Sequence, residues 1–501
     1  MIFGRQYTFW FCVGSQDLYG AECLEHVAEH ARIMVERINA SGLLPFPLTL
    51  KPTLLTSSMI RATFNEANAD DNCAGVITWM HTFSPAKSWI AGLQEFRKPL
   101  MHLMTQFNRE IPYDSIDMDF MNENQSAHGD REYGHAVTRL GIERKVIAGY
   151  WEDEKVLARV ASWMRTAIGV VESRRIRVLR MADNMRNVAV TEGDKTEAER
   201  VFGASINTWA VNDLVAAYEK VKDSQVKDLI EDYKAKYDVA PELLDSRYDE
   251  LFIAAKEEAA MVNMMRENGC TAGVDNFEDL GTLPQLPGVG PQRFPSEYGW
   301  GFSAEGDWKT SVLVRIGAVM GYGLEGGASL MEDYSYNFVP GNEFDMGSHM
   351  LEVSPSIGTI AKPKLAIYPL GIGGKSDPVR LVFSGKPADA VVVSMADERE
   401  RFRLLMDEVT IVEPQGSLKN LPCARAVWKP KPDLKTAVQC WITAGGSHHT
   451  CMTTSVGREA WEDFARIAGV ELAVIDENTN ARQFEKELEL SEMYHRLNNR
   501  H

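Results

Sequence analysis

Short apolar runs alternate with amphipathic stretches along the first third of the chain. Residues 7–14 ("YTFWFCVG") and 73–80 ("CAGVITWM") are almost wholly apolar, as strands buried on both faces of a sheet are. Between them, apolar residues repeat at the 3,4 spacing of one helix face, and Gly42 follows as a stop signal. The repeating positions are Leu24, Val27, Ala31, Met34 and Ile38.

The same alternation continues to about residue 106. Strands are predicted at "PLTLK" and "PLMHLMTQ", and helices from Ser57 to about Ala67 and after Pro85. Strands that alternate with amphipathic helices indicate βαβ units, which build a parallel sheet with helices on both faces. Ligands bind such sheets at the loops that follow the strands, so "GSQDLYG" and "HTFSPAK" are candidate site loops.

A second α/β unit is predicted to begin near Arg174, where "RIRVLRMAD" has the pattern of a strand. Helical patterns follow at 211–221, 225–237 and 247–267. The last third changes to short strand-like runs separated by turns, with little helix before "REAWEDFARIAG", which favours an antiparallel barrel or sandwich. These runs are "KLAIYPLG", "VRLVFSG", "ADAVVVSMAD", "FRLLMDEVTIVEP" and "AVQCWITAGG".

Three domains are therefore expected: α/β domains at 1–173 and 174–324, and a β-rich, barrel-like domain at 325–501. A chain of 501 residues has room for three domains at the usual size. Its net charge of −18 argues against partners such as nucleic acid or anionic membrane, because both attract basic patches.

Cysteine usage and the N-terminus favour a cytoplasmic protein. The seven cysteines are odd in number and form no CxxC motif, which is typical of reduced thiols. The apolar run at 7–14 is too short for a signal peptide and has only Arg5 before it, so a strand is the better interpretation. No run reaches the roughly 18 apolar residues that a membrane span needs.

Two glycine-rich stretches look like nucleotide-binding motifs without the required context. The match at Gly321, Gly323 and Gly326 precedes "GASLMEDYSY", which has the pattern of a strand where a dinucleotide site needs a helix. "GIGGKS" ends like a phosphate-binding loop, but Pro369 stands where the first glycine is required. We expect a turn there, although its glycines would let backbone line a pocket.

Acids and histidines occur together in four segments of the last 200 residues. Glu305 lies in "GFSAEGDWKT", Glu332 in "GASLMEDYSY", His349 in "MGSHMLEV", and the pair His448 and His449 in "GGSHHT". Carboxylate and imidazole ligands with open water positions suit Mn²⁺, with Co²⁺ or Mg²⁺ as substitutes. Neighbouring residues on a strand point to opposite faces, so one histidine of the pair should face a site. The residues alone leave open which one, and whether these segments meet.

Ten motifs in the same order make the chain similar to the bacterial L-arabinose isomerase family along its whole length. They are "GSQDLYG", "HTFSPAK", "DSIDMDFMNENQSAHG", "DNMRNVAVTEGDK", "NTWAVNDL", "EGDWKT", "MEDYSY", "GSHMLEVSPSI", "LGIGGK" and "AGGSHHT". The resemblance implies an intramolecular oxidoreductase that converts L-arabinose to L-ribulose in the first step of arabinose catabolism. A slower conversion of D-galactose to D-tagatose is implied as well. So are three domains, as in L-fucose isomerase, and a homohexamer of two trimers.

The resemblance also assigns roles to residues. One Mn²⁺ per subunit would bind Glu305, Glu332, His349 and His449, which selects the second histidine of the pair. Glu305 and Glu332 would exchange protons with the sugar, and His128 would open its ring. A neighbouring subunit would supply the pocket rim, and this chain its wall. The implied substrate-binding residues are Gln16, Leu18, Tyr19 and Gln125 at the rim and Met185, Phe277, Tyr334, Ile372 and His448 at the wall.

One position departs from the family pattern. After His128 the chain reads "GDRE", where the family pattern has Gly-Gly-Arg-Glu. The extra carboxylate of Asp130 is expected to add a negative charge near the sugar pocket and to affect substrate preference and pH optimum.

Two other classes of protein fit parts of the pattern. A metal-dependent sugar-phosphate lyase or aldolase also passes through an enediolate, but it needs a phosphate site, and neither glycine-rich stretch offers one. A sugar-binding receptor also has α/β lobes, but it needs no paired glutamates with a metal. Turnover of free L-arabinose, and the effect of a metal on it, would separate the three.

Overall fold

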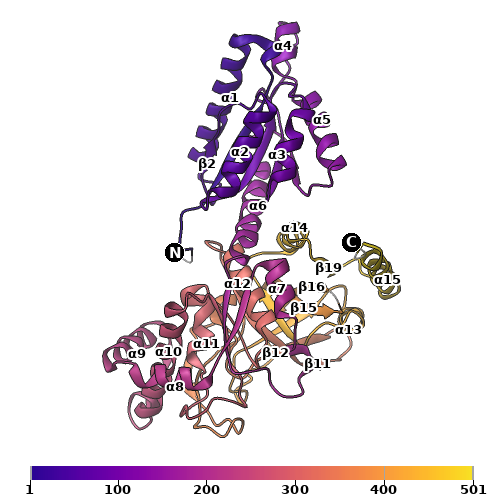
Figure 1. Cartoon of the computed structure of the whole chain (residues 1–501). Coiled ribbons are helices and arrows are strands. Elements are labelled where there is room, and N and C mark those ends of the chain that lie inside the picture. The colour runs from indigo at the N-terminus through magenta and orange to yellow at the C-terminus, as the bar shows by residue number, and fades with distance from the viewer. Residues whose placement is uncertain (1–2, 400, 499–501) are drawn as a thin grey trace. The chain divides into compact units, whose positions relative to one another are not determined.

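The computed structural model describes residues 3–399 and 401–498, which form two compact units (Figure 1). The first spans residues 3–171 and the second begins at Glu172. The predicted boundary near residue 174 falls close to this division, while the three-domain division stays a prediction. Each unit is described by itself.

The first unit is a parallel five-stranded sheet in the order β2-β1-β3-β4-β5. The predicted apolar runs form its centre, because all but one residue of β1 and every residue of β3 are buried. The strands are β1 (Thr8–Gly14), β2 (Leu48–Leu50), β3 (Cys73–Met80), β4 (Leu100–Met104) and β5 (Lys145–Ala148). The helices are α1 (Gly20–Ala40), α2 (Ser57–Ala69), α3 (Ile90–Glu95), α4 (Met118–Glu123), α5 (Ser126–Arg139) and α6 (Glu154–Ser173).

Local signals in this unit act as predicted. Gly42 lies two residues after the end of α1 and has a φ of 69°, the left-handed conformation that is typical of helix ends. Pro85 precedes a 3₁₀ turn at Ala86–Trp89 that continues into α3. The two loops "GSQDLYG" and "HTFSPAK" follow β1 and β3, which are neighbours in the parallel sheet, so both lie at the same edge.

The second unit begins with a parallel four-stranded sheet in the order β10-β9-β6-β7. The strands are β6 (Arg177–Met181), β7 (Ser205–Trp209), β9 (Ala272–Val274) and β10 (Gly301–Ser303). The helices are α7 (Lys195–Phe202), α8 (Val211–Lys220), α9 (Asp223–Lys236), α10 (Tyr248–Glu267), α11 (Val289–Arg293) and α12 (Trp308–Met320). The three predicted helical stretches correspond to α8, α9 and α10.

The β-rich part of the second unit is a closed antiparallel barrel. Six strands pair in the order β15-β18-β11-β12-β17-β16, and β15 also pairs with β16, which closes the ring. A further strand, β19 (Glu471–Ile475), extends it parallel to β16. The six are β11 (Ala328–Asn337), β12 (Phe344–Ser348), β15 (Ala388–Glu398), β16 (Arg401–Val412), β17 (Arg425–Pro430) and β18 (His449–Thr453). The fold prediction, two parallel α/β layers followed by a barrel, is confirmed.

Two of the predicted strands lie outside the barrel. "KLAIYPLG" and "VRLVFSG" form β13 (Lys364–Ile367) and β14 (Val379–Val382), which join β8 (Asp238–Val239) in a small separate sheet. One continuous core includes Leu365 of this sheet, Phe302 of the parallel sheet and Met452 of the barrel. The parts of the second unit are therefore fixed relative to one another by shared packing.

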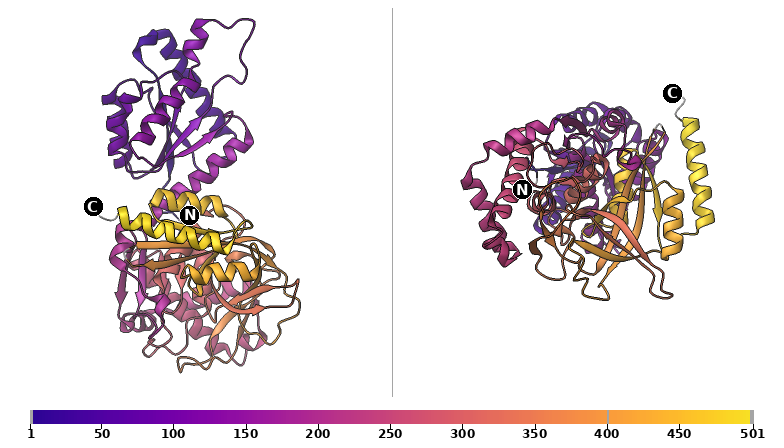
Figure 2. Two further views of the ribbon diagram at one scale, coloured as in Figure 1. Left: turned by 90° about the vertical axis from the view of Figure 1, so that its right-hand side faces the viewer. Right: turned by 90° about the horizontal axis from the view of Figure 1, so that it is seen from below.

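The strand predicted at "AVQCWITAGG" is wrong, because Leu434–Thr443 forms the helix α13. Asp433 caps it by accepting hydrogen bonds from the backbone N–H groups of Lys435 and Thr436. Leu434, Ala437 and Cys440 are buried at helical spacing. α13 packs against α15 (Ala481–Asn498) on the outside of the barrel, and Figure 2 shows the two helices side by side. Asp433 directly before the apolar run is the sequence signal for this helix, because aspartate is typical of a helix start.

Both glycine-rich stretches lack nucleotide-binding geometry, as predicted. Gly321 caps the C-terminus of α12, and the next regular element is the strand β11. "GIGGKS" is a turn in which Gly373 and Gly374 have positive φ. All seven cysteines are free thiols. Within residues 3–399 and 401–498, no helix is both long and apolar enough to cross a membrane.

Candidate active site

Antiparallel pairing in the barrel brings three of the predicted metal ligands together. Glu332 in β11 stands opposite His449 in β18 and opposite Ser348 in β12, and His349 follows Ser348 directly. His349 Nε2 lies 3.6 Å from Glu332 Oε2. One nitrogen or oxygen atom from each of Glu332, His349 and His449 lies within 4.8 Å of the others.

Glu305 reaches the same place from the parallel sheet, two residues after β10. Its Oε2 lies 3.9 Å from His449 Nε2. Glu305 has a φ of 61°, in the left-handed region that costs a residue with a side chain of this size about 1–3 kcal/mol. Backbone hydrogen bonds hold this conformation: Met185 N–H donates to the Glu305 carbonyl at 2.9 Å, and Gly306 N–H donates to the Asp275 carbonyl at 2.7 Å.

A carboxylate lies behind each of the two buried imidazoles. His349 Nδ1 contacts Glu352, and His449 Nδ1 lies 3.2 Å from Asp307 Oδ2. Such a partner places the proton on Nδ1 and leaves the lone pair on Nε2, as in most histidines that bind metals. His449 Nε2 is buried without a hydrogen-bond partner among the described residues. A buried polar atom of this kind calls for an explanation, and a metal ion provides one.

The buried groups of the site have pKa values shifted in different directions. Burial lowers the pKa of His349 to about 4, so its lone pair is available at neutral pH. Burial raises the pKa of Glu332, because its charged form has lost water. Burial acts to lower the pKa of His449, but the hydrogen bond and the charge of Asp307 outweigh it and raise the pKa. Two carboxylates and two imidazoles that converge from separate elements fit a divalent ion.

Asp307 and Glu352 were not predicted from the sequence. Asp307 also caps α12, because its Oδ1 accepts from the backbone N–H groups of Lys309 and Thr310. Glu352 is 1% exposed and accepts from the N–H of Leu351 at 2.9 Å. The sequence offered one signal for them: Asp307 lies two residues after Glu305, and Glu352 lies three residues after His349. Acids that cap helices or lie on the surface occur at the same distances from other residues, so this spacing alone does not identify a site.

The histidine pair departs from simple strand alternation. His448 lies just before β18 begins, and its Nε2 is 3.8 Å from Glu332 Oε1, so both rings approach the acids. The expectation that only one of them faces the site is therefore wrong. The two still differ, because His449 is fully buried and the side chain of His448 is 39% exposed.

The predicted wall residues lie at different depths. Phe277 is buried, and its ring stacks 5.9 Å from the ring of His349. Met185 contacts Glu305 through its backbone. Burial and the charge of Glu332 raise the pKa of Tyr334, whose exposed fraction is 48%. Ile372 is 39% exposed in the glycine-rich turn. Binding of substrate by these residues stays a prediction.

The predicted rim residues and His128 all lie in the first unit. Tyr19 Oη donates to Gln125 Oε1 at 3.0 Å, which joins the loop after β1 to the start of α5. Leu18 beside Tyr19 is 83% exposed. His128 lies in the first turn of α5, and its ring is 4.5 Å from the ring of Phe83. Gln16, Leu18, Tyr19, Gln125 and His128 thus form one local group, and their roles stay predictions.

The structure places the carboxylate of Asp130 among buried polar residues. Asp130 is 8% exposed, and its Oδ1 lies 2.8 Å from His102 Nε2 in the interior of the first unit. His102 Nδ1 in turn contacts Thr78 Oγ1 at 3.0 Å. The carboxylate therefore belongs to a buried polar group, and its effect on substrate preference and pH optimum stays a prediction.

Comparison with known proteins finds relatives that cover almost the whole chain. Family models for the L-arabinose isomerase N-terminal, central and C-terminal domains match residues 4–175, 177–323 and 327–471. L-arabinose isomerase of Bifidobacterium adolescentis is 83% identical over 492 residues, which cover 98% of both chains. That of Bifidobacterium longum is 76% identical over 98% of both. That of Geobacillus thermodenitrificans is 50% identical over 98% of this chain and 99% of the relative.

The fold, the paired acids and these matches make the chain an enzyme of the isomerase class. It belongs to the L-arabinose isomerase family.

Proposed function

We propose that this enzyme converts L-arabinose to L-ribulose, the first step of L-arabinose catabolism in the cytoplasm, and D-galactose to D-tagatose more slowly. The observation that carries the proposal is the convergence of Glu305 and Glu332 on the unpartnered Nε2 of His449. An aldose–ketose isomerisation moves one proton between C1 and C2 and another between O1 and O2. Two carboxylates on one site can exchange both protons.

One Mn²⁺ per subunit would be held by Glu305, Glu332, His349 and His449, with Co²⁺ or Mg²⁺ as substitutes. Such an ion supplies Lewis-acid stabilisation to the enediolate charge. The donor set supports this choice, because a site of carboxylate and imidazole without thiolate favours these ions over a structural zinc. Asp307 and Glu352 keep the two imidazoles oriented, with Nε2 towards the acids.

The remaining groups would bind and prepare the sugar. One of Glu305 and Glu332 accepts the proton from C2 and returns it at C1, while the other serves the oxygens. His128 shuttles the proton that opens the sugar ring, and Phe277 excludes water beside His349. Because His128 and the rim residues belong to the first unit, we propose that they serve the site of a neighbouring subunit in a homohexamer.

Turnover of free sugars tests the reaction. With Mn²⁺, purified enzyme should isomerise free L-arabinose fastest and D-galactose more slowly, and a sugar phosphate should give no faster reaction. Glu305→Gln should lose the activity, whereas Glu325→Gln, an exposed glutamate near the start of β11, should retain it. Faster turnover of a phosphorylated sugar would point to the lyase or aldolase class. Metal-independent sugar binding without turnover would point to a receptor.

Subunit exchange tests the shared site. Inactive Glu305→Gln and inactive His128→Ala chains are mixed under conditions that exchange subunits. Hybrid sites that combine an intact Glu305 with an intact His128 should restore activity. Proven exchange without recovery would place both residues of each site in one chain.

Deuterium labelling tests the path of the hydrogen. A proton held on a carboxylate can exchange with solvent, so turnover in D₂O should place deuterium at C1 of L-ribulose, as NMR would detect. Exchange is partial where the pocket excludes water. Complete retention of label from C2-deuterated arabinose, with no solvent deuterium in the product, would indicate a hydride shift instead.

A further inference from the structure

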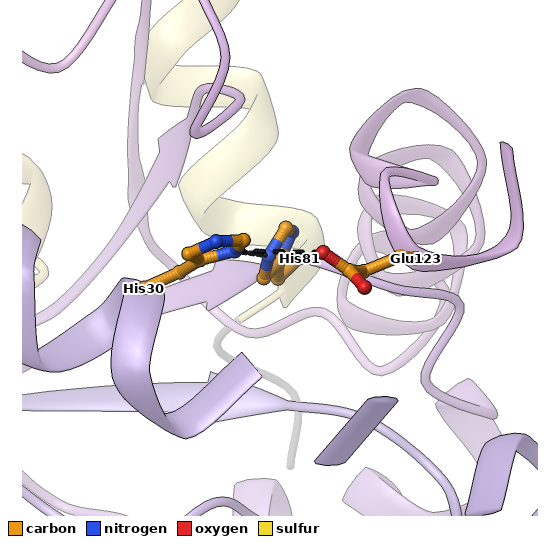
Figure 3. Close-up of side chains that lie close together, drawn as sticks. All are labelled: His30, His81 and Glu123. Atoms are coloured by element: carbon orange, nitrogen blue, oxygen red, sulfur yellow. Dashed lines mark hydrogen bonds and ion pairs between the residues drawn. The ribbon is translucent and has the colours of Figure 1, made fainter. Parts of the chain in front are cut away.

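We propose that the first unit contains a second divalent-metal site, formed by His30, His81 and Glu123, that takes a late first-row ion such as Zn²⁺. Figure 3 shows the three side chains pointing toward one another. They come from three elements: His30 from the middle of α1, His81 from the residue after β3, and Glu123 from the end of α4. None of them belongs to the isomerase site proposed above, and the inference does not depend on that function.

The three side chains are close enough to share one ion. His30 Nδ1 lies 2.7 Å from His81 Nε2 and 3.8 Å from Glu123 Oε1. One ligand atom from each lies within 4.8 Å of the other two. Zinc bonds to nitrogen measure about 2.0–2.1 Å, so a tetrahedral ion would separate the two nitrogens to roughly 3.4 Å. The side chain of His30 is 20% exposed at the surface of α1, which leaves it room for this small movement.

Both imidazoles are in the form that binds metals. Burial lowers the pKa of His81 to about 3, and burial also lowers the pKa of His30. Each ring is therefore neutral at pH 7 and carries one lone pair. Across the 2.7 Å contact, one ring donates a hydrogen bond and the other accepts it. The accepting ring therefore carries its own proton on the nitrogen that faces away from the contact. A metal on His81 Nε2 would place the proton of this ring on Nδ1, which is buried without a hydrogen-bond partner among the described residues.

Aromatic packing holds the two rings in place. His30 stacks on Phe107 with ring centres 3.8 Å apart, and His81 stacks on Trp79 with centres 4.6 Å apart. His81 and Trp79 are fully buried. Preorganised ligands lose little conformational entropy on binding an ion, which favours affinity.

His26 completes the surroundings of the site. It lies one turn before His30 on the same face of α1, and its Nδ1 is 2.8 Å from Glu123 Oε2. This contact turns the other carboxylate oxygen of Glu123 towards His30. His26 and Glu123 also line a surface cavity of about 380 Å³, with Cys23 and Tyr19 in its wall. Of the three proposed ligands, Glu123 lines this cavity, so an ion would enter from the side of Glu123.

An ion bound here would tie α1, α4 and the loop after β3 together. The hydrogen bond from Tyr19 to Gln125 joins the segments directly before α1 and after α4. The proposed site would therefore fix the part of the first unit that carries the predicted rim residues.

Zinc stoichiometry of the full-length chain tests the proposal. All variants are made in a His449→Ala background, which breaks the proposed isomerase site, and are stripped with chelator and dialysed against Zn²⁺. The background should bind one ion per chain. His30→Gln and Glu123→Gln should bind it at least about 10–100-fold more weakly, because each loses a direct ligand and loss of an outer-shell partner alone typically costs that much. Both positions are partly exposed, so these chains should keep the melting temperature of the metal-free background.

Two matched variants control for adventitious binding. His135→Gln removes an exposed histidine of α5 in the same unit, and Glu22→Gln removes an acid from the wall of the same cavity. Both should bind Zn²⁺ like the background. A background chain that binds no ion, or His30→Gln and Glu123→Gln chains that bind it as tightly as the controls, would overturn the proposal. Isomerase activity does not enter the readout, so the outcome is independent of the proposed reaction.

Discussion

Two clusters of histidine and carboxylate, one in each unit, hold their imidazoles in different ways. In the second unit a carboxylate lies behind each ring, Glu352 behind His349 and Asp307 behind His449. In the first unit His30 and His81 are held by the aromatic faces of Phe107 and Trp79. A carboxylate raises the basicity of its ring as well as orienting it, whereas stacking only orients it. We therefore expect the cluster of the second unit, whose rings have carboxylates behind them, to bind its ion more tightly than the cluster of the first unit.

A third histidine shows what separates both clusters from ordinary buried polar groups. His102 has Asp130 on one ring nitrogen and Thr78 on the other, so the ring has no nitrogen left for a ligand. His449 and His81 each retain a buried ring nitrogen without a partner among the described residues. The two candidate sites differ in this respect, because His449 offers its unpartnered Nε2, whereas His81 offers the Nε2 that faces His30 Nδ1.

The largest expected effect is loss of the ion from the second unit. EDTA should abolish isomerase activity and Mn²⁺ should restore it, and Glu305→Gln or Glu332→Gln should lose at least the roughly 10²–10⁴-fold that a general base contributes. His449→Ala should weaken Mn²⁺ binding far more than His448→Ala, as titration calorimetry would measure. If His448→Ala were the more damaging change, the assignment within the pair would be reversed.

Removal of the carboxylates behind the rings should have the next largest effect. Asp307→Ser and Glu352→Gln should each weaken Mn²⁺ binding about 10–100-fold. Serine is also a good helix cap, so Asp307→Ser separates support of His449 from capping of α12. The matched change Asp433→Ser at the start of α13 should leave metal affinity unchanged. Equal Mn²⁺ affinities in wild type and Asp307→Ser would show that packing alone orients the imidazoles well enough to bind the ion, in the second unit as in the first.

The pairing of His449 with Asp307 also predicts a pH dependence of the metal-free protein. The folded-state pKa of His449 is raised, so the pair contributes stability that is fully present below the unfolded pKa of about 6.5. That contribution is lost as the pH rises through the raised folded value. The difference in melting temperature between wild type and Asp307→Ser should therefore shrink with rising pH in chelator. A constant difference would mean that His449 does not titrate in this range.

The smallest expected effect concerns Asp130, which belongs to neither cluster. Burial raises its pKa although His102 opposes the shift, so the ionised form is less favoured in the folded state than in the unfolded chain. Asp130→Asn should gain stability relative to wild type as the pH rises from the unfolded pKa of about 3.9 through the raised folded value. Denaturant titrations below and above this window would measure the change. A relative loss of stability with rising pH would mean that the ion pair outweighs burial.

Much of the fold could be predicted from the sequence, because its signals are local. The apolar runs of β1 and β3 and the 3,4 spacing of α1 need no knowledge of distant residues. α13 was missed because Val438, Ile442 and Thr443, which are common in strands, lie on its partly or fully exposed face. The convergence of Glu305, Glu332, His349 and His449 depends on barrel register across more than 100 residues, which residue types cannot specify. Only the family motifs linked them beforehand.

The left-handed backbone at Glu305 has a consequence for the enzyme's response to selection. Glycine adopts this conformation without strain, and Glu305→Gly would also remove a negative charge from beside Glu332 and Asp275. In the metal-free protein both changes favour the folded state. A mutant library sorted for heat resistance under metal-poor conditions would therefore enrich chains that have lost an acid of the site. Selection for durability and selection for turnover act in opposite directions at this codon.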